Sequence, residues 1–414
     1  MKGNTKNNFL NKLGPGILYA GAAIGVSHLV QSTRAGALFG FYLIGVVILT
    51  NLIKYPFFEV SPIYTSKKKK NLLEGYLDLH PLVLISFLIV VLSTFLIIIS
   101  AITLVTAGLA ALIFPIGLSL NIWVAIMASF AVATIYFGKY NYLKVFTRYV
   151  VLSLTFFTLV AVGIAFSGSH EISFYLSKSI DLGNAIDLAF LLALIGWMPA
   201  PMELSVWHST WAMAEEKKPS YKDTMLDFKS GYWGTMVLAI AFLSLGSIVM
   251  FDSGESFSKS PVNFAGQLVN LFSSQFGSWS YYIIAFAAFA TMVSTLLTGF
   301  DAHPRIISEG YRFLRNKPNG KSIKLISNGV LFISGIGTVI ILFFFSDNIK
   351  MLVDFATIVS FIAAILISIF NFLIAYKLHK ENLYPKGWIR WTLMTIGIIG
   401  LIVLSVFFLK LKFS

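Results

Sequence analysis

Long apolar runs constrain the fold of this chain more than any other feature of its sequence. A helix needs about 20 mostly apolar residues to cross the hydrocarbon core of a bilayer, and roughly eleven such runs follow one another here. Only 12% of the 414 residues are charged, and the mean hydropathy is +0.81. We therefore expect an all-α membrane protein with a single transmembrane domain over 1–414. The runs lie at 15–38, 41–63, 82–115, 119–137, 145–168, 185–213, 231–250, 281–303, 323–346, 351–376 and 389–409.

Basic residues divide the loops into two groups. Cytoplasmic loops carry an excess of lysine and arginine. With the N-terminus inside, 24 of the 31 basic residues fall in inner segments and five in outer ones. Two more, Arg34 and Lys54, lie within spans, and we expect Arg34 to extend toward the membrane surface. The sequence thus predicts a multi-pass protein of the cytoplasmic membrane, embedded in the lipid bilayer, with its N-terminus in the cytoplasm.

The order of the spans predicts an internal repeat. Spans one to five and six to ten are equal in number, and an odd number makes the second group enter the membrane from the opposite side. We expect a first inverted repeat over 14–168, a second over 183–376 and an additional helix over 389–409. This arrangement is typical of secondary transporters.

Two spans are interrupted, and each opens one of these repeats. The first interruption runs from Gly25 to His28 and the second from Pro199 to Glu203. Non-helical backbone survives at membrane depth only where protein or a cavity satisfies its polar groups, and paired broken helices point to a transporter's substrate site. The candidate substrate-binding residues are Gly25, Ser27, His28, Ala200, Pro201 and Glu203.

The flanks of these interruptions resemble a known family. Gly14-Pro15-Gly16 and the stretch from Ala35 to Phe41 look like the flanks of the first helix of the Nramp divalent metal transporters, and Asn51 resembles a polar position of their second helix. Trp207-His208-Ser209 resembles the stretch that follows their sixth-helix motif. The resemblance implies a LeuT-type fold of two inverted five-helix repeats plus an eleventh helix. It also implies a substrate held between helices 1 and 6.

The motifs themselves depart from the family pattern. Where the family has Asp-Pro-Gly-Asn, this chain has Gly25 to His28, so the acid is lost and a histidine replaces the amide. Where the family has Met-Pro-His, the preferred register places Pro201, Met202 and Glu203, and a rival register uses Met198-Pro199-Ala200. The acids of the family's third helix are also missing, since the comparable stretch 102–106 contains none.

A cation site can still be assembled from what remains. Glu203 would supply a negative charge, His28 a nitrogen ligand and freed carbonyls hard oxygens. A single carboxylate suits a hard, partly hydrated ion of the Mg or Mn type better than cadmium, and we expect weakened proton coupling. Glu203 could instead form a structural pair with His28 or Arg34. A polar network or gate is expected from Asn51, His208, Asp301, His303 and Arg305.

Two other classes of function fit the same sequence. A LeuT-type carrier of a small organic solute or amino acid, and a non-transporting membrane receptor on the same scaffold, remain alternatives. The chain has no phosphate-cradling glycine loop, H-E-x-x-H or G-x-S-x-G motif, so we expect no enzyme and no cofactor. The basic residues are scattered over the inner loops, which argues against a nucleic-acid partner. The oligomeric state is left open.

Overall fold

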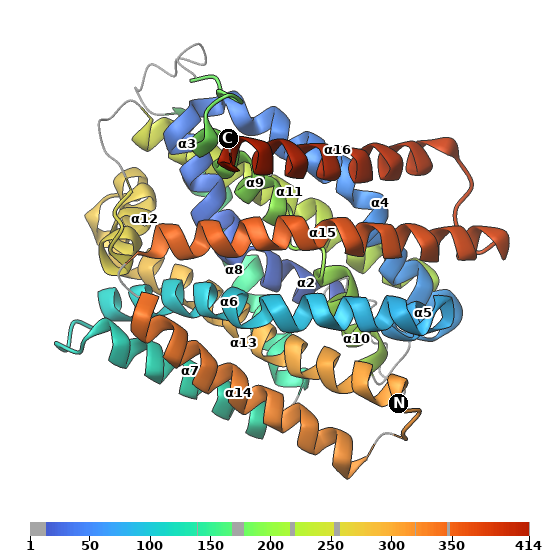
Figure 1. Cartoon of the computed structure of the whole chain (residues 1–414). Helices are drawn as coiled ribbons and strands as arrows, with labels where there is room; N and C mark the ends of the chain where they lie inside the picture. Colours follow the sequence, from blue (N-terminus) through green and yellow to red (C-terminus); the bar gives the residue numbers. More distant parts are fainter. Residues whose placement is uncertain are drawn as a thin grey trace, which may run out of the picture.

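The computed structural model describes residues 14–138, 140–167, 178–215, 220–251, 257–318, 320–345 and 348–413. All regular elements of this part are helices, and the long ones lie side by side (Figure 1). The α-helices are α2 (Pro15–Ala23), α3 (Thr33–Phe39), α4 (Ile44–Lys68), α5 (Leu72–Leu79), α6 (Pro81–Ile113), α7 (Leu120–Phe137), α8 (Tyr140–Ser167), α9 (Ala185–Trp197), α10 (Leu204–Ala214), α11 (Tyr221–Met250), α12 (Pro261–Phe276), α13 (Tyr281–Leu314), α14 (Lys321–Phe345), α15 (Ile349–Lys380) and α16 (Trp388–Phe413). A π-helix η1 (Gly25–Ser32) and two short 3₁₀-helices, η2 (Gly40–Leu43) and η3 (Ser278–Ser280), complete the set.

The predicted spans are confirmed to within a few residues at most of their ends. Nine helical stretches of the described chain are long and apolar enough to cross a membrane, and α9 is a shorter apolar helix. The first stretch, Pro15–Lys68, holds two of the predicted spans. They meet at Gly40, whose φ of 62° lies in the left-handed region and lets the chain turn between α3 and η2. Together, α9 and α10 form the sixth span.

The sixth span is broken, as predicted. α9 ends at Trp197 and α10 begins at Leu204, and residues 198–203 between them are buried and not helical. Lost helical hydrogen bonds are partly replaced by short turns, in which Leu204 N donates to Pro201 O and Ser205 N to Met202 O. Pro199 and Pro201 favour this interruption, because proline cannot donate a backbone hydrogen bond and clashes with the preceding turn.

The first span was predicted to be interrupted, and that prediction was wrong because the span stays helical throughout. Gly25–Ser32 widens into a π-helix that joins α2 to α3. A π-turn leaves some carbonyls without their usual helical partner, and side chains bind them here: Thr295 Oγ1 donates to Gly21 O at 2.9 Å, and Ser27 Oγ donates to Ala23 O. The polar backbone at this depth is therefore satisfied inside the protein, as a membrane interior requires.

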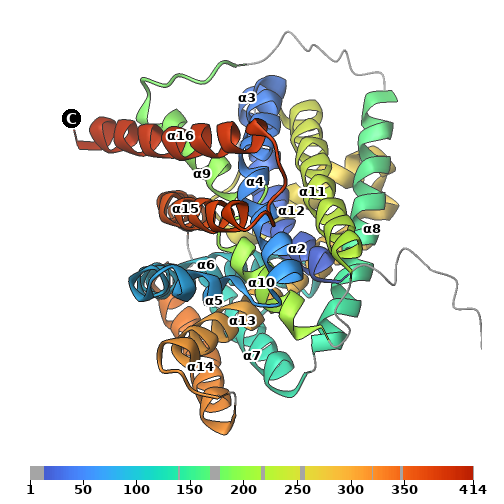
Figure 2. The same cartoon turned by 90° about the vertical axis from the view of Figure 1, so that its right-hand side faces the viewer.

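Helices of the first and sixth spans lie inside the bundle. α11 packs along α2, α3 and α4, while α13 packs along α6 and contacts α2. α3 and α11 approach closely through two glycines, because a Cβ added at Gly36 would meet Leu243 O at 1.9 Å and one at Gly246 would meet Thr33 O at 2.2 Å. α16 packs against α15 and α4, and α16 and α14 lie at opposite edges of the bundle (Figure 2).

Candidate functional site

Glu203 lies at the broken sixth span, where it is the N-cap residue of α10. Its side chain is 2% exposed. Oε1 accepts a hydrogen bond from Thr94 Oγ1 of α6 at 3.1 Å, and Oε2 lies 3.9 Å from His303 Nε2 of α13. An ionisable side chain at this depth is costly, and such residues are functional candidates by default. The break thus brings a carboxylate to a point where three helices meet.

His303 presents a lone pair to that carboxylate. Its Nδ1 lies 2.9 Å from Gly299 O, and because a carbonyl oxygen can only accept, Nδ1 carries the proton and the neutral ring has its lone pair on Nε2. Neither His303 Nε2 nor Glu203 Oε2 has a hydrogen-bond partner among the described residues. Two buried electron-rich atoms 3.9 Å apart repel unless a proton or a cation lies between them. This pair is the centre of the candidate site.

Among the described residues, no hydrogen bond or ion pair joins His28 to Glu203. His28 Nε2 lies 2.9 Å from Thr235 O of α11, and Nδ1 lies 2.7 Å from Ser27 Oγ and 2.9 Å from Ala23 O. Both ring nitrogens are therefore already engaged by hydrogen bonds. A role for His28 as metal ligand stays a prediction, and it requires that these bonds be given up.

The other predicted substrate contacts are buried at the two spans. Gly25 lies against α13, because an added Cβ would meet Thr295 Oγ1 at 2.4 Å. Ala200 is fully buried in the non-helical segment, and the Pro201 carbonyl accepts the Leu204 N–H. Carbonyl oxygens near the break are thus only partly free to bind a solute.

The residues predicted as a gate or polar network fall into separate groups. Asp301 pairs with Arg305 at 2.7 Å and accepts from Trp211 Nε1 at 2.9 Å. His208 Nδ1 lies 2.9 Å from Ser61 Oγ, and Asn51 donates to Val47 O at 2.8 Å. His303 faces Glu203 instead. One connected network of all five predicted residues is therefore not found in the described structure.

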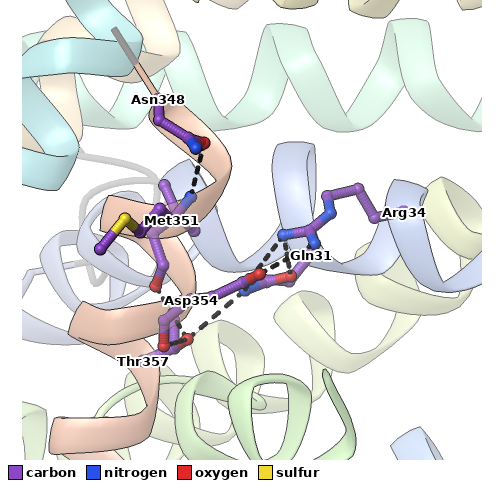
Figure 3. A network of polar contacts seen from close by, with 7 residues as sticks. Gln31, Arg34, Asn348, Met351, Asp354 and Thr357 are labelled. Atoms are coloured by element: carbon purple, nitrogen blue, oxygen red, sulfur yellow. Dashed lines mark hydrogen bonds and ion pairs between the residues drawn. The ribbon is translucent and has the colours of Figure 1, made fainter. Parts of the chain in front are cut away.

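Arg34 is buried, and the prediction that it extends to the membrane surface was wrong. Its side chain is 3% exposed and pairs with Asp354 of α15 through Nη1–Oδ1 at 2.7 Å and Nη2–Oδ2 at 3.2 Å. Gln31 Oε1 accepts from Arg34 Nη1 at 3.1 Å, and Gln31 Nε2 reaches toward Thr357 Oγ1 at 3.5 Å (Figure 3). This network joins the first span to α15 at the end predicted to face outside.

Lys54 is a second buried cation, and no role was predicted for it from the sequence. It is 3% exposed on α4, and its Nζ donates to Ile195 O at 2.6 Å and to Gly196 O at 3.1 Å, two carbonyls in the last turn of α9. A lysine at the bilayer centre costs about 3 kcal/mol. A lysine inside an apolar run was the signal that could have identified it, but its partner could not be read from the sequence.

Side-chain ligands for a metal ion are few at this site. Within the described residues, no group of three or more His, Asp or Glu side chains lies close enough to hold one ion. Glu203 and His303 can supply one oxygen and one nitrogen. An ion bound between them would complete its coordination with water or backbone carbonyls, which is the behaviour of hard divalent cations.

The amino-acid sequence is similar to that of a known protein family over most of the chain. The sequence pattern of the family described as natural resistance-associated macrophage protein-like (Nramp) matches residues 16–411. A protein of Pasteurella multocida (strain Pm70), PM0681, is 34% identical over 400 residues, which is 95% of this chain and 90% of that protein.

Solved structures share the architecture at low sequence identity. The Eremococcus coleocola manganese transporter superposes with a TM-score of 0.72 at 15% identity, covering 97% of this chain and 86% of that one. A Na⁺-coupled sialic acid symporter gives a TM-score of 0.60 at 13% identity, with 97% and 89% covered. MhsT, solved with L-phenylalanine, also gives 0.60 at 13% identity, with 95% and 98% covered. The fold is therefore the LeuT-type fold that the sequence predicted.

Proposed function

The chain belongs to the Nramp family, and from this membership we propose that it is a secondary transporter that moves a divalent metal cation across the cytoplasmic membrane. The family is one of transporters, not of enzymes. The excess of basic residues in alternate loops supports a cytoplasmic N-terminus. The two inverted repeats over 14–168 and 183–376 would rock against each other around the site.

One observation carries the proposal: Glu203 Oε2 and His303 Nε2 face each other, buried and without hydrogen-bond partners among the described residues. Metal–oxygen and metal–nitrogen bonds of about 2.1 Å each span up to about 4.2 Å, so one ion fits between atoms 3.9 Å apart. A carboxylate about 4 Å from a divalent charge contributes roughly 8 kcal/mol of attraction at an effective dielectric near 20. Such an ion would end the repulsion between the two lone pairs.

The ligand set supports a hard and partly hydrated substrate. One carboxylate and one imidazole leave most of the coordination shell to water and carbonyls, and Mg²⁺ usually keeps several waters. No methionine sulfur is needed in this arrangement. The Eremococcus coleocola protein, which shares the fold, is a manganese transporter. We infer that this chain carries an ion of the Mg or Mn type and binds cadmium weakly.

The test is uptake into proteoliposomes by purified wild-type protein and by Glu203→Gln. Glutamine keeps the size of the side chain and removes its charge. Manganese or magnesium uptake should fall at least tenfold in this variant, while thermal unfolding stays cooperative. Glu309→Gln is the matched control, because that carboxylate pairs with Arg312 away from the break and its uptake should equal wild type.

The alternatives are outcomes of the same experiment. Wild-type metal uptake by Glu203→Gln would show that the carboxylate is structural. Amino-acid uptake without any response to metals would favour a LeuT-type carrier of small organic solutes. No uptake of any compound in the panel, with a well-folded protein, would favour a non-transporting receptor.

A further inference from the structure

Lys54 joins two of the transporter's helices by an unusual contact. α4 carries the side chain, and its Nζ donates to the carbonyls of Ile195 and Gly196. These residues belong to the last turn of α9, which ends at Trp197 because the chain is broken there. The last four carbonyls of a helix have no partner within the helix, although Ile195 O here also accepts the Met198 N–H at 3.3 Å. The ammonium therefore binds two oxygens of the turn at which α9 ends.

Electrostatic attraction as well as hydrogen bonding stabilises the Lys54 ammonium at the end of α9. A helix carries about half a negative charge at its C-terminal end, and the Lys54 ammonium sits at that end of α9. Among the described residues no carboxylate oxygen forms an ion pair with it. The positive charge is thus balanced by backbone dipoles alone, as an inorganic cation bound by carbonyls would be.

The C-terminal ends of broken half-helices are cation sites in transporters of this architecture. Unwound carbonyls and half-helix C-termini there coordinate coupling ions such as Na⁺. In this chain the same chemical position is taken by a side chain of α4. Gly196 also allows α15 to approach, since an added Cβ would meet Thr357 O at 2.6 Å. The carbonyls are thus held in place by neighbours on two sides.

We propose that the Lys54 ammonium is a tethered cation that occupies the cation-binding position at the C-terminal end of α9, so that no inorganic monovalent ion is required there. This inference goes beyond the proposed function and does not depend on which solute is carried. It predicts that removal of the side chain exposes an empty site for a monovalent cation. The ligands of that site would be the carbonyls of Ile195 and Gly196.

The test measures cation binding to purified full-length Lys54→Ala through its thermal unfolding midpoint. The protein is titrated with sodium chloride or with propylammonium chloride, and choline chloride keeps the ionic strength constant. Propylammonium restores the three carbons and the nitrogen that the substitution removes, and choline has no N–H to donate. Each probe should raise the midpoint with a half-maximal concentration at least tenfold below that of wild type, which corresponds to about 1.4 kcal/mol.

Three variants separate this interpretation from simpler ones. Lys54→Arg keeps the cation and should show no saturable response. Lys54→Gln keeps a donor without the charge and should bind sodium, which also covers the case in which Lys54→Ala does not fold. Lys70→Ala removes a lysine paired with Asp78 near the membrane surface and should respond like wild type.

The proposal is overturned if sodium stabilises wild type as strongly as Lys54→Ala. It is also overturned if neither Lys54→Ala nor Lys54→Gln responds to either probe, because Lys54 would then be only a helix cap. An equal response of Lys70→Ala would mean that the effect is a general one of salt. None of these readouts uses metal uptake, so their outcome does not test the proposed function, and a failure of one proposal can be told from a failure of the other.

Discussion

The ion pair between the buried Arg34 and the partly exposed Asp354 should hold the predicted outer end of the transporter closed. It joins η1 and α3 of the first span to α15, and Gln31 connects it to Thr357, one turn further along α15 (Figure 3). Asp354→Asn removes the negative charge and keeps the shape of the side chain. We expect this change to favour opening at this end without unfolding the protein.

The magnitude follows from the geometry. Two unit charges about 4 Å apart attract by about 4 kcal/mol at an effective dielectric of 20, and the Arg34 side chain is only 3% exposed. Asparagine still accepts one hydrogen bond, and the Asp354 side chain is 27% exposed, so the net loss is about 2 kcal/mol. If the pair exists only in the closed form, the open population rises about 30-fold.

Cysteine labelling measures that population. The chain contains no cysteine, so Thr357→Cys introduces a single thiol at a position that is 0% exposed beneath the ion pair. Its reaction rate with a membrane-impermeant maleimide reports opening from the predicted outer face. The rate should rise about 30-fold in Asp354→Asn and return toward the parent value in Asp354→Glu.

Lys350→Gln is the matched control for this experiment. Lys350 is an exposed cation near the start of α15 and lines the same outer pocket of about 450 Å³ as Arg34 and Asp354. Its removal changes the net charge but leaves the ion pair intact. An unchanged labelling rate in a folded Asp354→Asn protein, or an equal rise in Lys350→Gln, would refute the argument that the pair closes this end.

Two further changes test the packing of the bundle. Gly36→Ala should lower the free energy of unfolding by about 1–3 kcal/mol, because its Cβ would lie 1.9 Å from a backbone oxygen of α11. Gly45→Ala is the control and should be neutral, since nothing lies within 4 Å of an added Cβ there. Thermal unfolding in detergent measures both effects. Arg390→Leu should cost about 2 kcal/mol because Glu59, whose side chain is 1% exposed, loses its partner at 2.6 Å. Equal stability of Arg390→Leu and wild type would show that the hydrogen bond from Tyr55 to Glu59, at 2.9 Å, is enough to stabilise the buried carboxylate.

Much of the architecture could be read from local properties of the sequence. The length of each apolar run determines whether it can cross the bilayer, and those runs became the helices. Two closely spaced prolines, Pro199 and Pro201, favour a break in the sixth helix because each lacks the backbone donor that a helix needs, whereas α4 and α13 continue through Pro56, Pro62 and Pro304. The first span shows the limit of this reasoning, since residues from Gly25 onward stay helical once neighbouring side chains bind the carbonyls that the π-turn leaves free.

Partners of the buried polar groups were decided only by the tertiary structure. The sequence identified Glu203 and His28 as a pair, but packing turned His28 toward α11 and placed His303 of α13 beside Glu203. The sequence also marked Arg34 and Lys54 as charges inside spans without indicating what they bind. Each partner depends on how far the helices are rotated and shifted against one another, and glycine contacts such as those between α3 and α11 determine this. Hydrophobicity and charge along the chain predict that a buried charge needs a partner, but only the packing of the helices determines which residue is that partner.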